Sequence, residues 1–401
     1  MRIAYISYEY PPDTAVGGIG TYTWQMSKAM ALQNCDVEVF TASPTREITE
    51  RVDNVNIHRI KINNQKDFNL AIVEAFENVH LNNRFDIIEC AENGVNALNI
   101  IKKYPNIPLV VRLHTPGVLV TRMQNTYAPL IAKLRFVLGA LIRGKIDLGF
   151  WSKHDKNQDQ DVEYLITKQA KLITAPSESL KKWAVDFWGI APQKIKVIPN
   201  PYLPADEFLN IPIENTNTTI TFYGRLNVLK GCVPLTHAIK KVLKKHPDWS
   251  FKIVGKNENS HITNVDMKSW MQFELKNYKS NIEFIEWLDY NAVPNLLRKS
   301  AICVFPSLFE SFSYTCCESM SAGRAVVGSK NGGMKELLTG KCGLLVNPKR
   351  PREIADAICK FIETPELRTT YGKHARQKVI NEYNLEKIGN ATFERFSKLM
   401  S

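Results

Sequence analysis

Short apolar runs separated by longer stretches with helical periodicity constrain the fold of this chain more than any other feature of its sequence. Seven such runs lie at 2–8, 36–42, 56–62, 85–90, 108–114, 171–177 and 195–200, and six more lie at 219–225, 250–256, 281–287, 301–307, 325–330 and 343–348. Strands that alternate with helices predict βαβ units and mostly parallel sheets. Between the two sets, residues 200–218 are rich in Pro and Asn, which predicts a linker. The chain is therefore predicted to be an α/β protein with two Rossmann-like, doubly wound domains.

Length and composition fit this organisation. The 401 residues, 44% of them hydrophobic, can bury a large core and are enough for two domains. The N-terminal run lacks the basic and apolar regions of a signal peptide, and basic residues interrupt the apolar segment 130–145, which argues against a membrane span. Eight cysteines without a CxxC motif favour reduced thiols over a zinc site or a disulfide scaffold. We expect a folded cytoplasmic protein.

The charge balance bears on the partners. The 52 basic and 40 acidic side chains give a net charge of +12, which favours phosphate-bearing partners or an acidic membrane surface. A solubilising basic surface explains the charge equally well. Nucleic acid is not an expected partner, because the basic residues are spread along the chain and no helix-turn-helix, RRM or zinc-finger pattern accompanies them.

Glycines follow the first predicted strand. Gly17, Gly18 and Gly20 precede a helix that we expect to begin near Thr21. Such a turn lets backbone N–H groups approach an anion, although an ordinary glycine-rich turn has the same composition. The spacing is not the GxGxxG of dinucleotide-binding proteins, and no acid ends the second strand at 40–41, which disfavours a nicotinamide dehydrogenase.

Charged residues follow two strands of the second set. Arg225 and Lys230 come just after one strand and could hold a diphosphate, although a solvated basic loop is the alternative. Glu310 and Glu318 come after another strand. With a helix from about Phe312, eight residues turn through roughly 800°, so the two carboxylates cannot stack and should face different parts of a ligand.

The start of that helix is a third candidate for phosphate contact. The backbone N–H groups of Ser313, Tyr314 and Thr315 would point toward an anion placed between the two glutamates. Because ligands of open parallel sheets bind beyond the carboxyl ends of the strands, we expect the site in a cleft between the two domains.

The ordered set of motifs resembles the retaining glycosyltransferases of family 4. It comprises GGIG at 17–20, IPN at 198–200, GR and KG within 224–231, the two glutamates eight positions apart, the run 322–338 and GLLVNP at 343–348. The resemblance spans most of the chain and implies the two-domain GT-B fold. The implied domains are an acceptor-side domain at 1–200, a donor-side domain at 201–375 and a helix at 376–401 that crosses back to the first domain.

The resemblance also implies roles for the second-domain residues. Glu310 would contact hydroxyls of the donor hexose, and Glu318 would hold the ribose of the nucleotide. Arg225 and Lys230 would clasp the donor diphosphate.

In the first domain, Gly17 and Gly18 would close over the phosphate and the acceptor, and His114 would lie beside the donor sugar. The catalytic set implied by the resemblance is therefore Glu310, Arg225, Lys230 and His114.

The chain departs from the family pattern at three places. Ser313 stands where the family usually has glycine, Pro201 and Tyr202 replace the usual GV, and 254–257 lacks a second glycine. These departures concern contacts with the base and the sugar rather than the reaction.

The reaction implied is transfer of a hexose from a nucleoside diphosphate sugar, with UDP-glucose first by family frequency, to a hydroxyl of a saccharide or lipid-linked saccharide in polysaccharide or glycolipid biosynthesis. The configuration at the anomeric carbon would be retained. No cofactor and no metal is expected, because the cations meet the charge that develops on the diphosphate, and each such donor contributes about 3 kcal/mol. A sugar-nucleotide epimerase and a catalytically silent sugar-nucleotide-binding protein stay open as alternatives.

The segment 120–145 interleaves apolar and basic residues at helical spacing. A helix of this kind can lie on an anionic bilayer and reach a lipid-linked acceptor, which would make the protein peripheral at the inner face of the membrane. A helix packed on the first domain is the alternative.

Overall fold

The computed structural model describes residues 1–14, 17–125, 130–142, 144, 158–259 and 265–400. Contacts between residues divide the chain into two compact units. The first contains 1–117, 154–203 and 382–401, and the second contains 118–153 and 204–381. These units differ from the expected ranges 1–200 and 201–375 mainly in the described residues of 118–153, which group with the second unit.

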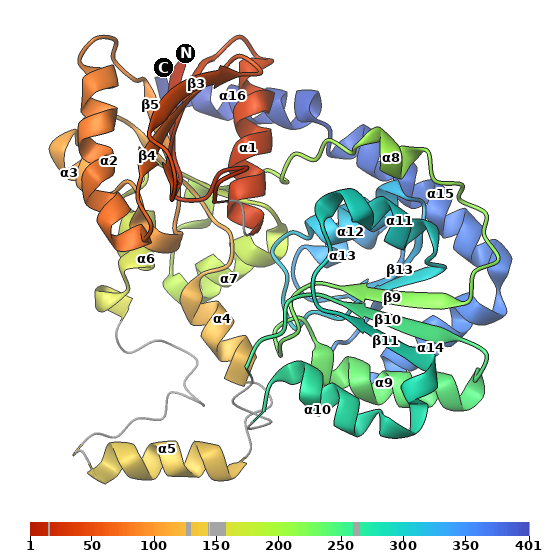
Figure 1. The fold of residues 1–401 in the computed structure, drawn as a ribbon. Coiled ribbons are helices and arrows are strands. Elements are labelled where there is room, and N and C mark those ends of the chain that lie inside the picture. The colour runs from red at the N-terminus through yellow and green to blue at the C-terminus, as the bar shows by residue number, and fades with distance from the viewer. Residues whose placement is uncertain (15–16, 126–129, 143, 145–157, 260–264, 401) are drawn as a thin grey trace. The chain divides into compact units, whose positions relative to one another are not determined.

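The first unit is built on an eight-stranded sheet with the order β3-β4-β2-β1-β5-β6-β7-β8 (Figure 1). All neighbouring strands are parallel except β3 and β4. The strands are β1 (Arg2–Ile6), β2 (Asp36–Ser43), β3 (Ile48–Val52), β4 (Val55–Lys61), β5 (Ile87–Ala91), β6 (Leu109–Arg112), β7 (Leu172–Ala175) and β8 (Ile195–Val197).

The sequence did not predict strand β3. It lies at the edge of the sheet, and most of its residues are exposed, so it lacks the apolar alternation of a strand with one buried face. Asp53 and Asn54 join it to β4 with φ angles of 50° and 63°. Two positive φ angles are typical of the tight turn of a β-hairpin. Asp and Asn tolerate this conformation, so the pair Asp53-Asn54 is the sequence signal that could have identified the hairpin.

The helices of the first unit are α1 (Gly18–Ala31), α2 (Gln65–His80), α3 (Leu98–Lys103), α6 (Val162–Gln169), α7 (Glu178–Trp188) and α16 (Leu385–Met400). Helix α16 packs against α1, with Ile388 and Phe396 in the same buried cluster as Met26 and Met30. The C-terminal end of the chain therefore completes the core of the first unit.

The second unit is built on a six-stranded parallel sheet with the order β11-β10-β9-β12-β13-β14. Its strands are β9 (Thr219–Tyr223), β10 (Ser250–Val254), β11 (Ile282–Ile285), β12 (Ile302–Phe305), β13 (Ala325–Ser329) and β14 (Leu344–Val346). Each of the thirteen runs expected to form strands contains one, and the doubly wound α/β prediction is confirmed.

The helices of this unit are α4 (Gly117–Gln124, whose first residue groups with the first unit), α5 (Leu130–Ile142), α8 (Asp206–Leu209), α9 (Cys232–Lys245), α10 (Met267–Glu274), α11 (Val293–Arg298), α12 (Tyr314–Ser321), α13 (Met334–Leu338), α14 (Pro351–Glu363) and α15 (Pro365–Glu382). Helix α8 lies within the segment that we expected to be only a linker.

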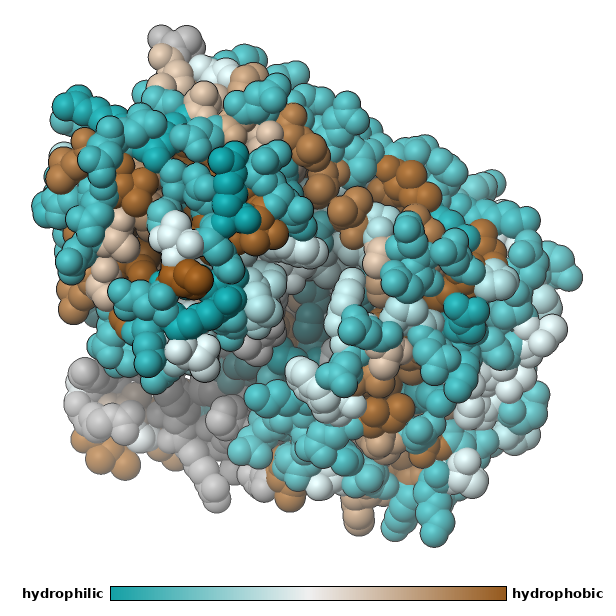
Figure 2. Space-filling model, turned by 45° about the horizontal axis from the view of Figure 1, so that its top comes forward, coloured by the Kyte–Doolittle hydropathy of each residue, from teal (hydrophilic) through white to brown (hydrophobic). Residues whose placement is uncertain are grey.

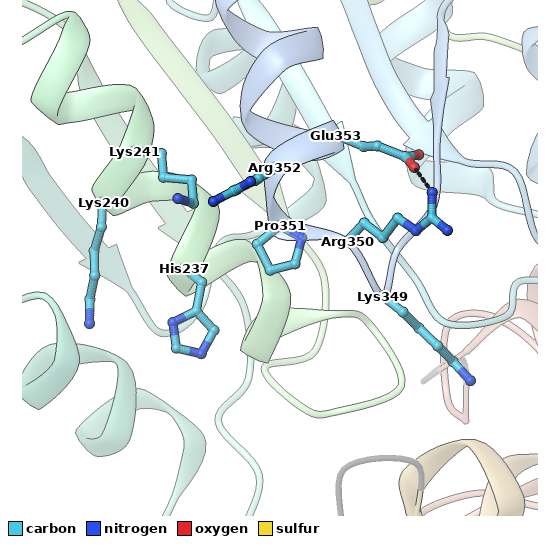
Figure 3. A pocket seen from close by; sticks show the side chains of 8 residues that line it. All are labelled: His237, Lys240, Lys241, Lys349, Arg350, Pro351, Arg352 and Glu353. Carbon is cyan, nitrogen blue, oxygen red and sulfur yellow. Dashed lines mark hydrogen bonds and ion pairs between the residues drawn. The ribbon is translucent and has the colours of Figure 1, made fainter.

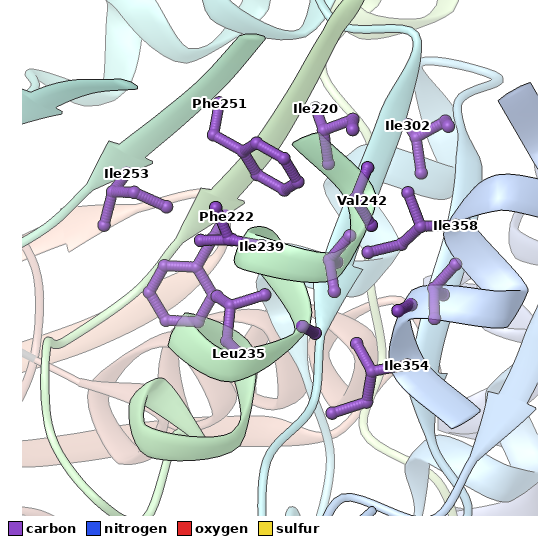
Figure 4. Close-up of a cluster of buried hydrophobic side chains, with 14 of the residues drawn as sticks. Ile220, Phe222, Leu235, Ile239, Val242, Phe251, Ile253, Ile302, Ile354 and Ile358 are labelled. Carbon is purple, nitrogen blue, oxygen red and sulfur yellow. The ribbon is translucent and has the colours of Figure 1, made fainter. Parts of the chain in front are cut away.

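Helices α9 and α14 cover one face of the second sheet (Figure 4). Leu235, Ile239 and Val242 follow the spacing of one helix face, and they are buried against β9, β10 and β12. Ile354 and Ile358 do the same from α14. Each buried side chain of this size contributes about 1.5 to 3 kcal/mol, so the contact fixes both helices on the sheet.

The structure divides the segment 120–145 between α4 and α5, and residues 126–129, 143 and 145 lie outside the described residues. None of the described helices combines the length and the apolar composition needed to cross a membrane. On the face shown in Figure 2, hydrophobic residues form small separate groups among hydrophilic ones. All eight cysteines are buried and free, as expected.

Candidate functional site

Two loops at the carboxyl edge of the second sheet carry four of the ten predicted site residues, Arg225, Lys230, Glu310 and Ser313. Strands β9 and β12 are hydrogen-bonded neighbours, so the loops 224–231 and 306–313 that follow them start side by side. The backbone N–H of Leu308 donates to the carbonyl of Leu229 at 2.8 Å, which ties one loop to the other. Strand order thus brings together residues that are 80 positions apart in the sequence.

Lys230 and Glu310 form an ion pair at this edge. The Lys230 Nζ atom lies 2.6 Å from Glu310 Oε2, and the Ser307 hydroxyl donates to the same oxygen at 3.2 Å. The side chains of Lys230 and Glu310 are only 23% and 15% exposed, so water and salt screen the pair less than a surface pair. A ligand bound here would meet a cation and a carboxylate next to each other.

Two glycines make this geometry possible. Gly231, at the start of α9, has a φ of 78°, and a Cβ atom there would lie 1.9 Å from the carbonyl oxygen of Pro306. Gly332 has a φ of 75°, and its Cβ would lie 2.1 Å from the carbonyl oxygen of Glu310. Only glycine adopts this conformation without strain and leaves room for the backbone that approaches it. The two glycines therefore support the positions of Lys230 and Glu310.

Arg225 belongs to the same loop but is more accessible, with 59% of its side chain exposed. Its NH1 atom lies 3.3 Å from Glu258 Oε1, and the Asn227 amide donates to Glu258 Oε2 at 2.7 Å. Asn227 Oδ1 accepts from the backbone N–H of Lys230 at 2.9 Å. Sequence reasoning missed Asn227 and Glu258, because Glu258 comes near Arg225 only through the pairing of β10 with β9.

Glu318 is buried behind these loops on α12. The Tyr223 hydroxyl lies 2.7 Å from Glu318 Oε2 and 2.6 Å from the carbonyl oxygen of Thr315. Burial raises the pKa of Glu318 to about 7. The carboxyl group therefore changes its ionisation close to neutral pH.

The two glutamates have different surroundings. Glu310 pairs with a lysine near the surface, whereas Glu318 is 8% exposed and bonded to a tyrosine. Sequence reasoning missed Tyr223, the last residue of β9, because its contact with Glu318 depends on where α12 packs.

Helix α12 begins at Tyr314, two residues later than the expected Phe312, and the expectation about its start was wrong. Ser313 is the N-cap residue, and its Oγ accepts from the backbone N–H of Cys316 at 3.3 Å. This serine oxygen satisfies one of the first N–H groups of the helix. Tyr314 and Thr315 occupy the first two helical positions, whereas Ser313 precedes them.

In the first unit, α1 begins at Gly18 rather than near Thr21. Gly17 is its N-cap residue, and a Cβ atom at Gly18 would meet nothing within 4 Å. The backbone N–H of Gly20 donates to the carboxylate of Glu9 at 3.3 Å. An acidic side chain of the protein therefore lies at the helix start where we expected an anion to approach.

His114 follows strand β6 and is held by Glu92, whose two carboxylate oxygens both lie 3.0 Å from the backbone N of His114. Burial and the charge of Arg112 lower the pKa of His114 to about 3, so the imidazole is neutral at physiological pH. Its Nε2 atom is buried and has no hydrogen-bond partner among the described residues. This nitrogen is therefore a polar atom that lacks a partner.

A buried polar cluster lies behind His114. The Tyr22 hydroxyl donates to Glu89 at 2.6 Å, and burial raises the pKa of Glu89 to about 7. The Arg112 guanidinium lies 4.5 Å from the centre of the Tyr22 ring and donates to Asn200. A cavity of about 10 Å³, lined in part by Glu89, Tyr22 and His114, is just large enough for one water. No pattern in the sequence predicts this cluster, because its members lie on different strands and helices.

Among the described residues, His246, Cys359 and Glu363 form a group with the geometry to hold a metal ion. They lie at the C-terminal ends of α9 and α14, and the Glu363 carboxylate is bound to Lys245 at 2.5 Å. The lysine already neutralises the only carboxylate of the group.

Comparison with known proteins supplies the family. Residues 16–202 match the model described as glycosyltransferase family 4, and residues 206–378 match the model described as glycosyl transferases group 1. The uncharacterized glycosyltransferase MJ1607 of Methanocaldococcus jannaschii is 22% identical over 415 residues, which cover 98% of this chain and 97% of that protein.

Two solved structures resemble the whole chain. Sucrose-phosphate synthase from Thermosynechococcus elongatus has a TM-score of 0.73 and 20% identity, covering 99% of this chain and 98% of its own. The Anabaena Alr3699/HepE protein in complex with UDP-glucose has a TM-score of 0.69 and 14% identity, covering 99% of this chain and 100% of its own. At these identities the likeness shows the fold.

Proposed function

This chain belongs to glycosyltransferase family 4 and has the GT-B fold, and from that premise we propose that it transfers a hexose from a nucleoside diphosphate sugar to a hydroxyl group with retention of configuration. The observation that carries the proposal is the side-by-side placement of Lys230 and Glu310 at the carboxyl edge of the second sheet, with Glu318 buried behind them.

Each of these groups suits one part of a sugar nucleotide. Lys230, with Arg225 on the same loop, offers positive charge to the diphosphate, and Glu310 offers a carboxylate to hydroxyls of the hexose. Glu318, once ionised, can accept hydrogen bonds from two ribose hydroxyls. The arrangement supports binding of the three parts of the donor in the order ribose, diphosphate, sugar.

The reaction follows from the charge that develops as the glycosidic bond of the donor breaks. Negative charge appears on the diphosphate, where Lys230 and Arg225 stabilise it more than in the ground state. The acceptor hydroxyl attacks from the same face, and the leaving phosphate oxygen takes its proton. The assignment of Glu318 to the ribose leaves Glu310 without a second carboxylate across the reacting bond, so we propose no covalent sugar–enzyme intermediate.

We propose UDP-glucose as the first donor to test. The structure of Alr3699/HepE with UDP-glucose supports this choice through the shared fold. A panel of nucleoside diphosphate sugars, scored by release of the nucleoside diphosphate, identifies the base and the sugar.

We also propose that the transfer needs no divalent metal, since Lys230 and Arg225 supply positive charge to the diphosphate. Excess EDTA should then leave the rate nearly unchanged. A loss of more than about tenfold that Mg²⁺ or Mn²⁺ restores would show that the two cations are not sufficient.

For the acceptor, we propose a saccharide or a lipid-linked saccharide reached at a membrane surface. Leu130, Leu134, Leu138 and Leu141 of α5 are each about half exposed or more, and their spacing puts them on one side of the helix. An apolar stripe of this kind inserts into the boundary between headgroups and acyl chains, and nearby basic residues favour anionic lipid.

Sedimentation with anionic vesicles tests this contact. Leu134→Ser/Leu138→Ser should reduce binding, whereas Leu70→Ser/Leu81→Ser, two exposed leucines of the first unit, should leave it unchanged. Equal binding by both double variants would return α5 to a purely structural role.

The decisive experiment for the transfer measures nucleoside diphosphate release by wild type, by Glu310→Ala and by Glu283→Ala. Glu283 is an exposed glutamate of the same sheet and serves as the matched control. We expect turnover to fall at least a hundredfold in Glu310→Ala only, because a misplaced sugar loses its alignment with the acceptor. Proton NMR of the product reports the anomeric configuration. Interconversion of sugar nucleotides without transfer would indicate an epimerase, and binding without turnover would indicate a silent scaffold.

A further inference from the structure

A basic hollow of about 770 Å³ lies in the second unit between α9 and the start of α14 (Figure 3). His237, Lys240 and Lys241 line it from α9, and residues 349–353 line it from the other side. None of the residues that line it belongs to the candidate donor site. The two sites share helix α9, on which His237 lies six residues beyond Gly231, or about 9 Å along the axis at 1.5 Å per residue.

The hollow carries more positive charge than its neighbours neutralise. Lys240 is paired with Glu274, and Arg350 is paired with Glu353 at 2.9 Å. For the other three cations, Lys241, Lys349 and Arg352, no described residue forms an ion pair.

A solvated basic surface, on which long cationic side chains can spread apart, does not explain why these cations lie around one hollow. The residues come from α9 and from the start of α14 with the loop before it, more than 100 positions along the chain, and the hydrophobic core beneath them fixes α9 against α14. The like charges are therefore held together by the fold. Burial, together with the charges of Lys240 and Lys241, lowers the pKa of His237, while Glu274 acts in the opposite direction. Burial makes the largest contribution to this lowering of the pKa, and the two lysines add to it.

We propose that this hollow binds a phosphate-bearing ligand other than the donor nucleotide sugar. Arg352 can bind phosphate oxygens through its planar fork, and Lys241, whose amine faces it in Figure 3, can act as a point charge on the same group, whereas Lys349 extends away from both. A volume of about 770 Å³ exceeds the needs of one phosphate and leaves room for a ligand with further atoms. A phosphorylated saccharide and an anionic phospholipid headgroup share this chemistry.

The test uses two double variants of equal charge change. Lys241→Gln/Arg352→Gln removes one unpaired cation from each side of the hollow. Lys244→Gln/Lys360→Gln removes two exposed cations from the same two helices outside it. Both pairs of substitutions leave the candidate donor site intact, so nucleoside diphosphate binding and transfer serve as a check of folding.

Binding of inorganic pyrophosphate is followed by NMR of the His237 imidazole, assigned with His237→Gln. Pyrophosphate bound at the donor site would act on this signal equally in both double variants, so only a difference between the two variants reports on the hollow. In the wild type we expect a saturable shift and a rise in the pKa of His237, because a nearby anion favours the imidazolium. In Lys241→Gln/Arg352→Gln the affinity should fall at least tenfold, and in the control pair it should change by less than threefold.

A second arm separates the two sources of phosphate. Vesicles of phosphatidylglycerol are compared with vesicles of phosphatidylcholine in sedimentation assays on both double variants. Weaker sedimentation of the hollow variant alone assigns the site to a lipid headgroup, and pyrophosphate binding without that effect assigns it to a soluble phosphorylated ligand. Absence of both effects, or equal losses in the two double variants, overturns the proposal. We expect substitutions in α5 to leave the His237 signal unchanged, so that failure of the membrane contact is seen separately.

Discussion

Replacement of Glu318 by glutamine should remove a pH dependence of nucleotide binding that we expect of the wild type. On the proposed assignment of Glu318 to the ribose, the ribose hydroxyls donate hydrogen bonds to the ionised carboxylate, whereas burial in the free protein raises the pKa of this carboxyl group to about 7. A group with that pKa is about one-eleventh ionised at pH 6 and about ten-elevenths at pH 8. The affinity of the wild type for UDP should therefore rise about tenfold over this range.

The amide of Glu318→Gln does not titrate, so the variant lacks this rise. At pH 8 it should bind UDP at least tenfold more weakly than the wild type, since hydrogen bonds to a charged group contribute about 1.5 to 3 kcal/mol. At pH 6 the difference should shrink by about tenfold. The phosphate of UDP also titrates near pH 6, but it does so with both proteins and cancels in their ratio.

Calorimetry of UDP with both proteins at half-unit steps from pH 6 to pH 8 measures this ratio. Tyr223→Phe extends the test, because its hydroxyl lowers the pKa of Glu318 and its loss should move the rise in affinity to higher pH. A ratio of affinities that stays constant from pH 6 to pH 8 would refute the assignment of Glu318 to the ribose.

Three other changes have expected outcomes. Without nucleotide, Glu318→Gln should have a higher Tm than the wild type at pH 8 but not at pH 4. Burial raises the pKa of Glu318 in the folded state, so the contribution of this group to folding stability is complete below its unfolded pKa and is lost as the pH rises through about 7. A lower Tm of the variant at pH 8 would contradict the burial argument. Gly231→Ala should cost about 3 kcal/mol, from a positive φ and a clash with Pro306, and should lower the Tm of the second unit by about 6 to 12 °C in calorimetry; an unchanged Tm would mean that the loop relaxes freely. Lys230→Gln should weaken UDP binding about tenfold or more by titration calorimetry, since it removes a positive charge beside the diphosphate and the ion pair with Glu310. An affinity equal to that of the wild type would mean that Lys230 does not bind the diphosphate.

The sequence by itself determined the architecture of each unit. Alternation of apolar runs with helical stretches is a local pattern, and burial on both faces of a parallel sheet keeps those runs apolar. Each run that was predicted to form a strand therefore contains a strand in the structure. Strand β3 was not predicted because it is an exposed edge strand, and without a buried face its sequence does not alternate between apolar and polar residues. The start of α12 was predicted two residues early, because Ser311 and the actual cap Ser313 are equally suitable N-cap residues in the sequence.

Only the tertiary structure decided how the site residues meet. Lys230 reaches Glu310 because β9 and β12 are neighbours in the sheet, and strand order is not written in local periodicity. Tyr223 becomes the partner of Glu318 only once α12 packs behind β9, and that burial, rather than the spacing of the two glutamates, raises the pKa of Glu318. The basic hollow is likewise absent from any single stretch of sequence, because it forms where α9 and α14, more than 100 residues apart, are pressed together by the core beneath them. Side-chain chemistry is fixed by the sequence, but the dielectric, the partners and the neighbouring charges that tune it come from contacts between distant segments.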